Sequence, residues 1–85
     1  MLMQFIMEND MRTHNGIQYD DRHGGPFDRG SADSWYSRGI QPHYYVGGTG
    51  QSERIEGKDM TPAQLTAYMA GYEYNEQFGG KKNYE

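Results

Sequence analysis

The spacing of apolar residues predicts a helix over about residues 61–79. Its apolar positions recur at the i, i+3, i+4, i+7 interval of one helix face, at Leu65, Tyr68, Met69 and Tyr72. The segment opens with a capping box, in which Thr61 caps the first amide hydrogens and Gln64 reaches back to the chain before the helix. Gly79 and Gly80 indicate where this helix ends.

A shorter helix is predicted near residues 29–39. Its residues at helical spacing are Ala32, Trp35, Tyr36 and Gly39. Asp28 or Ser31 can accept the free amide hydrogens at its start, and Gly39 supplies a left-handed stop. A helix of about ten residues does not persist alone in water, so we expect it to dock on the later helix.

Gly71 in the later helix indicates a close contact. A glycine inside a helix costs ~1 kcal/mol relative to alanine, so we expect a large group to lie across it. The predicted group is Trp35. Tyr68 and Tyr72 would flank this notch, one turn apart, with their ring edges turned toward water or a partner. Trp35 and Gly71 are therefore the predicted structural residues.

The other segments have weaker patterns. Residues 40–58 are rich in Gly and Tyr, and two interpretations are open: a loose β-hairpin, or an ordered loop wrapped over the helices. Residues 12–27 contain the turn dipeptide Asn15-Gly16 and the sequence His23-Gly24-Gly25-Pro26, and we expect an irregular arm that packs through Ile17, Tyr19 and Phe27. For the Met-rich residues 1–10, a loosely docked terminus and an edge strand or short helix over the core are both open.

These patterns together predict a mainly α fold. Two short helices would pack through aromatic side chains, joined by a Gly- and Tyr-rich connector. A chain of 85 residues is expected to form one domain. The predicted parts are an irregular N-terminal arm at 1–27, a helical core domain at 28–80 and a C-terminal tail at 81–85.

The composition excludes several kinds of site. The chain has no cysteine, so disulfides and thiolate chemistry are excluded. The three histidines lack the spacing of a metal site, and no serine lies in a nucleophile motif. We therefore expect no enzymatic activity, no metal, no cofactor and no small-molecule substrate. The sequence shows no signal peptide and no apolar stretch of ~20 residues, which favours a cytoplasmic protein without membrane contact.

An aromatic surface is the best candidate for binding. Aromatic residues make up 14% of the chain, and eight of them are tyrosines. So many rings are hard to bury in so small a domain; the half-exposed rim of a core and a recognition surface are both open. Nearby arginines could stack on rings, bind phosphates or pair with Asp28 and Asp33. The predicted binding residues are Arg29, Arg38, His43, Tyr44, Tyr45, Tyr68 and Tyr72.

Two stretches, "RGSADSWYSRGIQPHYY" at 29–45 and "AYMAGYEYNE" at 67–76, resemble the ribosome modulation factor family. That family has an early helix that opens with Arg-Gly, a Cys-Pro-Tyr segment, and a later helix with a Trp-x-Gly-Gly-Trp core. Arg29-Gly30 matches the opening, and Pro42 with Tyr44 or Tyr45 approximates the middle. Residues 68–72, "YMAGY", match the last motif with Tyr for each Trp and Ala for the first Gly. The chain is also similar to small uncharacterised proteins of bacteria and their phages, through "RHGGPFDRGSADSWYSRG", "PHYY" and "MTPAQLTAYMAGYEYNE".

The first resemblance implies two helices, no catalysis, and docking on ribosomal RNA to silence translation. The family is basic, whereas this chain has a net charge of −4. Two functions are expected: a ribosome- or RNA-associated translation modulator, or an acidic phage-type protein that binds a host protein or defence complex. A small virion or self-associating component is a third option, and a homodimer is among the open partners. A positive, ring-lined surface around Arg29, Arg38, Tyr44 and Tyr45 would favour RNA, and a mixed one would favour protein.

Overall fold

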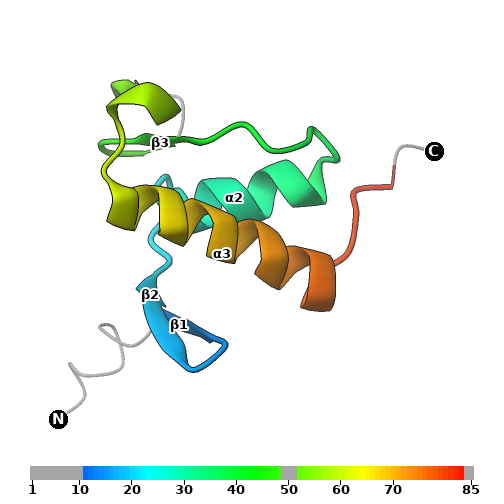
Figure 1. Ribbon diagram of the computed structural model, residues 1–85. Coiled ribbons are helices and arrows are strands. Elements are labelled where there is room, and N and C mark those ends of the chain that lie inside the picture. The colour runs from blue at the N-terminus through cyan, green and yellow to red at the C-terminus, as the bar shows by residue number, and fades with distance from the viewer. Residues whose placement is uncertain (1–10, 49–51, 84–85) are drawn as a thin grey trace, which may run out of the picture.

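Two α-helices pack against each other, and one antiparallel β-hairpin lies on each side of the pair (Figure 1). The computed structural model describes residues 11–48 and 52–83. Strands β1 (Met11–His14) and β2 (Ile17–Asp20) form the first hairpin, and β3 (His43–Tyr45) and β4 (Arg54–Glu56) form the second. Within the described residues, the helices are α2 (Pro26–Trp35) and α3 (Pro62–Phe78), with a short 3-10 helix, η1 (Gly57–Asp59), before α3.

The fold is mixed α/β, so the prediction of a mainly α fold is wrong. The predicted irregular arm contains the β1–β2 hairpin. Asn15 and Gly16, with φ of 54° and 80°, form its two-residue turn. A turn with both residues in the left-handed region matches the twist of paired antiparallel strands. The expectations for residues 1–10 fall outside the described residues.

The second hairpin confirms one of the two interpretations of residues 40–58. Tyr44 is opposite Ile55 in the strand register, and Tyr45 is opposite Arg54. The Tyr45 N–H also donates to the Gly24 carbonyl at 2.7 Å, outside the strand pair. This bond ties the β3–β4 hairpin to the segment immediately before α2.

Helix α2 begins and ends earlier than the predicted range of 29–39. Pro26 opens it, because a proline at the first helical position needs no amide hydrogen. The carboxylate of Asp28 accepts the Gly24 N–H at 2.8 Å, which satisfies a donor just before the helix. Ser37 and Gly39 have φ of 58° and 83°, so the chain has left the helical conformation before residue 39.

Helix α3 confirms the predicted capping box. The Thr61 side chain accepts the Gln64 N–H at 3.1 Å, and the Gln64 side chain accepts the Thr61 N–H at 2.9 Å. The observed helix, Pro62–Phe78, agrees with the predicted range to within one residue at each end. Among the described residues, no helix has the length and apolar character that a membrane crossing requires.

The helices cross with their backbones in contact at two glycines. A Cβ atom placed on Gly71 would lie 2.0 Å from the Phe27 carbonyl oxygen, and one on Gly30 would lie 2.0 Å from the Tyr68 carbonyl oxygen. The group that lies across Gly71 is thus the α2 backbone. The prediction that Trp35 fills this notch is wrong, and Trp35 is 39% exposed. Packing of the helices through aromatic rings is replaced at the crossing by backbone contact.

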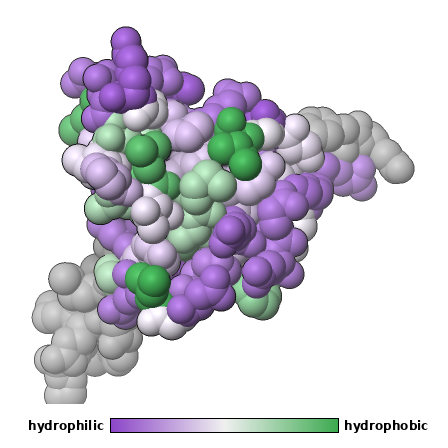
Figure 2. Space-filling model, in the orientation of Figure 1, coloured by the Kyte–Doolittle hydropathy of each residue, from purple (hydrophilic) through white to green (hydrophobic). Residues whose placement is uncertain are grey.

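Few of the apolar side chains that the structure describes are buried. Among the described residues they are Phe27, Met60, Tyr68 and Ala70. Phe27 contacts the rings of Tyr19 and Tyr74, at centroid distances of 5.5 and 5.8 Å. Of the three residues expected to pack the arm, Phe27 is buried and Tyr19 half-buried, whereas Ile17 is 54% exposed. Hydrophilic atoms cover the β3–β4 end and the C-terminal half of α3 on the face in Figure 2.

Candidate functional site

Three arginines surround one cavity of about 200 Å³, which we call the arginine pocket. Helix α2, the segment after it, and both strands of the second hairpin contribute to its lining. The lining residues are Arg29, Asp33, Arg38, Gln41, His43, Tyr45 and Arg54.

A buried polar cluster supports the arginine pocket. Asp33 is 1% exposed, and Tyr68 of α3 is fully buried. The Tyr68 hydroxyl donates to Asp33 Oδ2 and accepts the Gln41 N–H at 2.8 Å. Burial raises the pKa of Tyr68 well above its usual value, and the bond to the Asp33 carboxylate raises it further. Tyr68 is therefore a neutral donor at physiological pH.

The contacts of His43 fix its tautomer. His43 is 3% exposed, and its Nδ1 lies 2.7 Å from the Gln41 carbonyl oxygen. Because a carbonyl only accepts, Nδ1 carries the hydrogen and donates it. Nε2 is then an acceptor, and it receives the Nε–H of Arg29 at 3.3 Å. His43 therefore orients Arg29 and, in this tautomer, adds no charge to the pocket.

The other two arginines are oriented in the same way. Arg38 donates its Nε–H to Asp33 Oδ1 at 2.9 Å, and Arg54 donates its Nε–H to Glu56 Oε2 at 2.8 Å. The Arg54 Nη1 also donates to the Tyr45 hydroxyl at 3.4 Å, and this bond raises the pKa of Arg54 above its usual value. Each guanidinium has four further N–H donors on its terminal nitrogens, beyond the Nε–H that holds it in place.

The local charge of the pocket is opposite to that of the chain. Three arginines and one aspartate line it and give +2 with His43 neutral, whereas the chain carries −4. Carboxylates border it: Asp28 lies 3.7 Å from Arg29, and Glu56 contacts Arg54. The pocket lining is thus positive and its border is negative, while the other five Lys and Arg residues of the chain lie outside the lining.

The structure brings four of the seven predicted binding residues into the arginine pocket. They are Arg29, Arg38, His43 and Tyr45. Tyr44 is half-buried, and its hydroxyl accepts from the Gln64 side chain at 3.2 Å. Tyr68 is buried, so the prediction that its ring edge faces water or a partner is wrong. Tyr72 is half-buried, with its backbone N 2.9 Å from where a Cβ on Gly30 would lie.

Sequence reasoning missed Arg54, Asp33 and Gln41 as pocket residues, and Gly30 as the second contact glycine. Arg54 could have been predicted only if the β3–β4 hairpin had been assumed, because the strand register places it opposite Tyr45. Gly30 is a helical glycine like Gly71 and could have been found by the same reasoning. Gln41 contributes through its backbone, which its residue type does not reveal.

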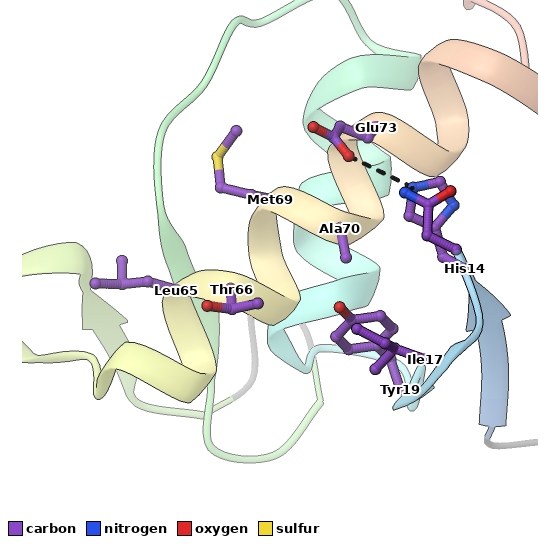
Figure 3. A pocket seen from close by; sticks show the side chains of 9 residues that line it. His14, Ile17, Tyr19, Leu65, Thr66, Met69, Ala70 and Glu73 are labelled. Carbon is purple, nitrogen blue, oxygen red and sulfur yellow. Dashed lines mark hydrogen bonds and ion pairs between the residues drawn. The ribbon is translucent and has the colours of Figure 1, made fainter.

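A second, larger concavity lies between the β1–β2 hairpin and α3 (Figure 3). It has a volume of about 380 Å³, and we call it the hairpin groove. His14 Nε2 and Glu73 Oε1 are 3.5 Å apart at one part of it, and Ile17 and Tyr19 approach Ala70 across it. Its lining residues are His14, Asn15, Ile17, Tyr19, Leu65, Thr66, Met69, Ala70 and Glu73.

Comparison with models of known protein families, with curated proteins and with solved structures gave no match to this chain.

Proposed function

We propose that this protein is a small, non-enzymatic RNA-binding module that acts on a ribosome in the cytoplasm and modulates translation. The observation that carries the proposal is the arginine pocket, in which three guanidiniums converge within a chain of net charge −4. Guanidinium is planar and presents paired N–H donors that match the oxygens of a phosphate. We propose a ribosome as the target because Arg29-Gly30 and residues 68–72 resemble the ribosome modulation factor family.

The tyrosines next to the pocket support this proposal through the arginines. The Arg29 and Arg54 guanidinium carbons lie 5.7 and 6.0 Å from the centroid of the Tyr45 ring. Arg38 lies 4.7 Å from the centroid of the Tyr36 ring, which is 40% exposed. Rings next to cations hold them in place and shield them partly from water. The pocket thus offers N–H donors for a phosphate, and their positions are set before a ligand arrives.

Cosedimentation with purified ribosomes at near-physiological salt tests the proposal. We expect the protein in the ribosome pellet, and we expect Arg54→Gln to weaken this association about tenfold or more, as for loss of one charged hydrogen-bond partner. Lys82→Gln is the matched control, because it removes one positive charge from an exposed residue beyond α3. A protein that stays in the supernatant at every salt concentration contradicts the proposal.

A second candidate is binding of a host protein by this acidic chain, and the hairpin groove favours it. Apolar side chains of Ile17, Leu65 and Met69 line this groove, and apolar concavities are common at protein contacts. An affinity pulldown from bacterial lysate separates the candidates. Ribosomal proteins with RNA support the first, whereas one stoichiometric protein, lost with Ile17→Lys and kept with Arg54→Gln, supports the second.

A further inference from the structure

We propose that the arginine pocket takes one terminal phosphate, a phosphate monoester, in preference to the phosphodiesters inside a nucleic-acid strand. This inference deepens the proposed function. It rests on that function for one source of the ligand, the terminal phosphate of an RNA strand. A free phosphate-bearing metabolite is the other source of the same chemistry. Three observations support this inference: the size of the pocket, its charge and the carboxylates around it.

The arginine pocket has the size of a single phosphate group and is too small for a whole nucleotide. Its volume is about 200 Å³, below the ~300–1,000 Å³ of sites that enclose complete small molecules. The lining donors come from three directions, because Arg29 belongs to α2, Arg38 follows that helix and Arg54 belongs to β4. Convergent donors around a small space match the several oxygens of one tetrahedral anion.

The charge of the pocket matches a monoester better than a diester. The lining residues carry +2, without Asp28 and Glu56 at the border, and a phosphate monoester carries about −1.5 to −2 at pH 7. An internal phosphodiester carries one negative charge and has two oxygens already esterified. A monoester therefore offers both the charge and a third terminal oxygen that three guanidiniums can bind.

The carboxylates next to the pocket disfavour a continuing phosphate backbone. Asp28 lies 3.7 Å from Arg29, and Glu56 Oε2 lies 2.8 Å from the Arg54 Nε. A strand that passed through the pocket would bring further phosphates near these charges. A phosphate at the end of a strand has a neighbour on one side only. Repulsion between these carboxylates and neighbouring phosphates therefore favours the end of a strand over its interior.

The pocket is also built in advance of binding. The Arg29 Nε–H is fixed by His43, which is 3% exposed, and the Arg38 Nε–H is fixed by Asp33, which is 1% exposed. Asp33 is held in turn by the Tyr68 hydroxyl. Side chains positioned by buried partners lose little freedom when a ligand binds, which favours affinity for a small group.

Thermal stabilisation by methyl phosphate and dimethyl phosphate tests the selectivity directly, at equal concentration and ionic strength. We expect methyl phosphate to raise the Tm of the full chain and dimethyl phosphate to have a much smaller effect. Arg54→Gln should abolish the methyl phosphate shift; the Arg54 side chain is 40% exposed. Arg54→Lys should restore part of the shift. Lys82→Gln should leave it unchanged. Equal shifts from the two esters, or a shift that survives Arg54→Gln, overturn the inference.

Anisotropy titrations with one RNA sequence, carrying a 5′-phosphate, a 3′-phosphate or hydroxyls at both ends, separate the two sources. Tighter binding of an end-phosphorylated RNA, by about tenfold or more, supports the inference and the proposed function together. Methyl phosphate selectivity without any RNA binding supports the pocket inference and contradicts the RNA function. RNA binding that ignores the terminal phosphate, with no methyl phosphate shift, overturns the inference and leaves the RNA function standing.

Discussion

Two glycine positions decide how closely the helices approach. At Gly71 and Gly30 a methyl group would lie 2.0 Å from a carbonyl oxygen of the other helix. A backbone oxygen cannot move aside as the tip of a flexible side chain can. The distance between α2 and α3 is therefore set by the lack of a side chain at these two positions.

Gly71→Ala should destabilise the fold, although alanine is the better helix former. Relief of the glycine penalty is worth ~1 kcal/mol, whereas overpacking against a fixed backbone costs ~1–3 kcal/mol and occasionally more. With a distance as short as 2.0 Å, we expect the cost to exceed the gain and the free energy of unfolding to fall by about 2 kcal/mol. Urea denaturation measures this change.

Thr66→Ala is the control for Gly71→Ala, because Thr66 is an exposed residue of the same helix. We expect its free energy of unfolding to stay within about 0.5 kcal/mol of the parent. A Gly71→Ala protein as stable as the parent, or more stable, would show that the helices can separate without cost. The close backbone contact would then not be a determinant of the fold.

Tyr68→Phe probes the buried polar cluster at a single oxygen. The change removes the donor to Asp33 and the acceptor for the Gln41 N–H. Groups left unsatisfied in a buried place cost ~1–3 kcal/mol, so we expect a loss of this size in denaturation. Tyr72→Phe, on a half-buried ring one turn later, should cost less. Equal losses from the two variants would contradict the assigned role of the Tyr68 hydroxyl.

At the scale of residues, the sequence indicated one of the two contact glycines, Gly71, but not what contacts it. A helical glycine signals close approach, and Gly71 lies at the crossing as predicted. The helical pattern cannot distinguish an approaching ring from an approaching backbone, so Trp35 was the wrong partner. Tyr68 was misplaced for a related reason. Tyrosine suits a half-exposed rim, and only the pairing with buried Asp33 places its hydroxyl inside the protein.

Elements with strong local signals were predictable, and the short strands were not. The capping box fixed the start of α3, because its hydrogen bonds are local to four residues. Strands β1 and β2 have four residues each, mostly exposed, so no alternation of apolar and polar residues marks them. Asn15-Gly16 was recognised as a turn, but the strands on both sides depend on pairing with each other. Helix α2 shifted because Gly25-Pro26 is both a loop signal and a helix start.

The C-terminal end of α3 is fastened to α2 by a polar cluster. Ser34 is fully buried, and its hydroxyl donates to Glu76 Oε2 at 2.7 Å and accepts from Asn75 Nδ2 at 2.8 Å. Lys81 contacts Glu76 and donates to the Ser34 carbonyl at 3.0 Å. The Lys82 N–H donates to the Trp35 carbonyl at 2.7 Å. The first residues after α3 therefore pack on the end of α2.

This cluster predicts a pH dependence of stability. The contact with Lys81, and then the Ser34 hydroxyl, lower the pKa of Glu76 below its usual 4.5. A carboxyl with a lowered folded-state pKa stabilises the fold fully above its unfolded pKa and loses this effect as pH falls through the folded value. We expect the Tm difference between the parent and Glu76→Gln to be constant near neutral pH and to shrink below pH 4.5. A difference that does not change with pH would contradict this linkage.

At the scale of the whole molecule, the pocket depends on contacts between distant parts of the chain. Arg29 and Arg38 were predicted as binding residues because they are near the aromatic residues in sequence. Arg54 joins them only through the register of β3 with β4. Composition gave a net charge of −4, yet it could not show that three arginines line one pocket. Local charge depends on the fold, and the fold depends on pairings that a single sequence leaves open.

This distribution of charge predicts a weak dependence of RNA binding on salt. For single strands, the slope of log K against log[salt] is about −0.7 for each phosphate neutralised. A protein that binds one terminal phosphate in the arginine pocket should show a slope between about −0.7 and −1.4. A protein that follows about six phosphates should show a slope near −4. The acidic remainder of the surface repels further phosphates, which argues for the shallow value.

Anisotropy titrations of end-phosphorylated RNA over a series of potassium chloride concentrations measure this slope. Arg54→Gln should make the slope shallower as well as weakening binding, because one fewer cation meets the phosphate. Lys82→Gln should change neither quantity, because Lys82 lies outside the pocket lining. A slope steeper than about −3 would mean that roughly four or more phosphates are neutralised. The arginine pocket places three guanidiniums around one small space, so such a slope would place the binding surface elsewhere on the chain.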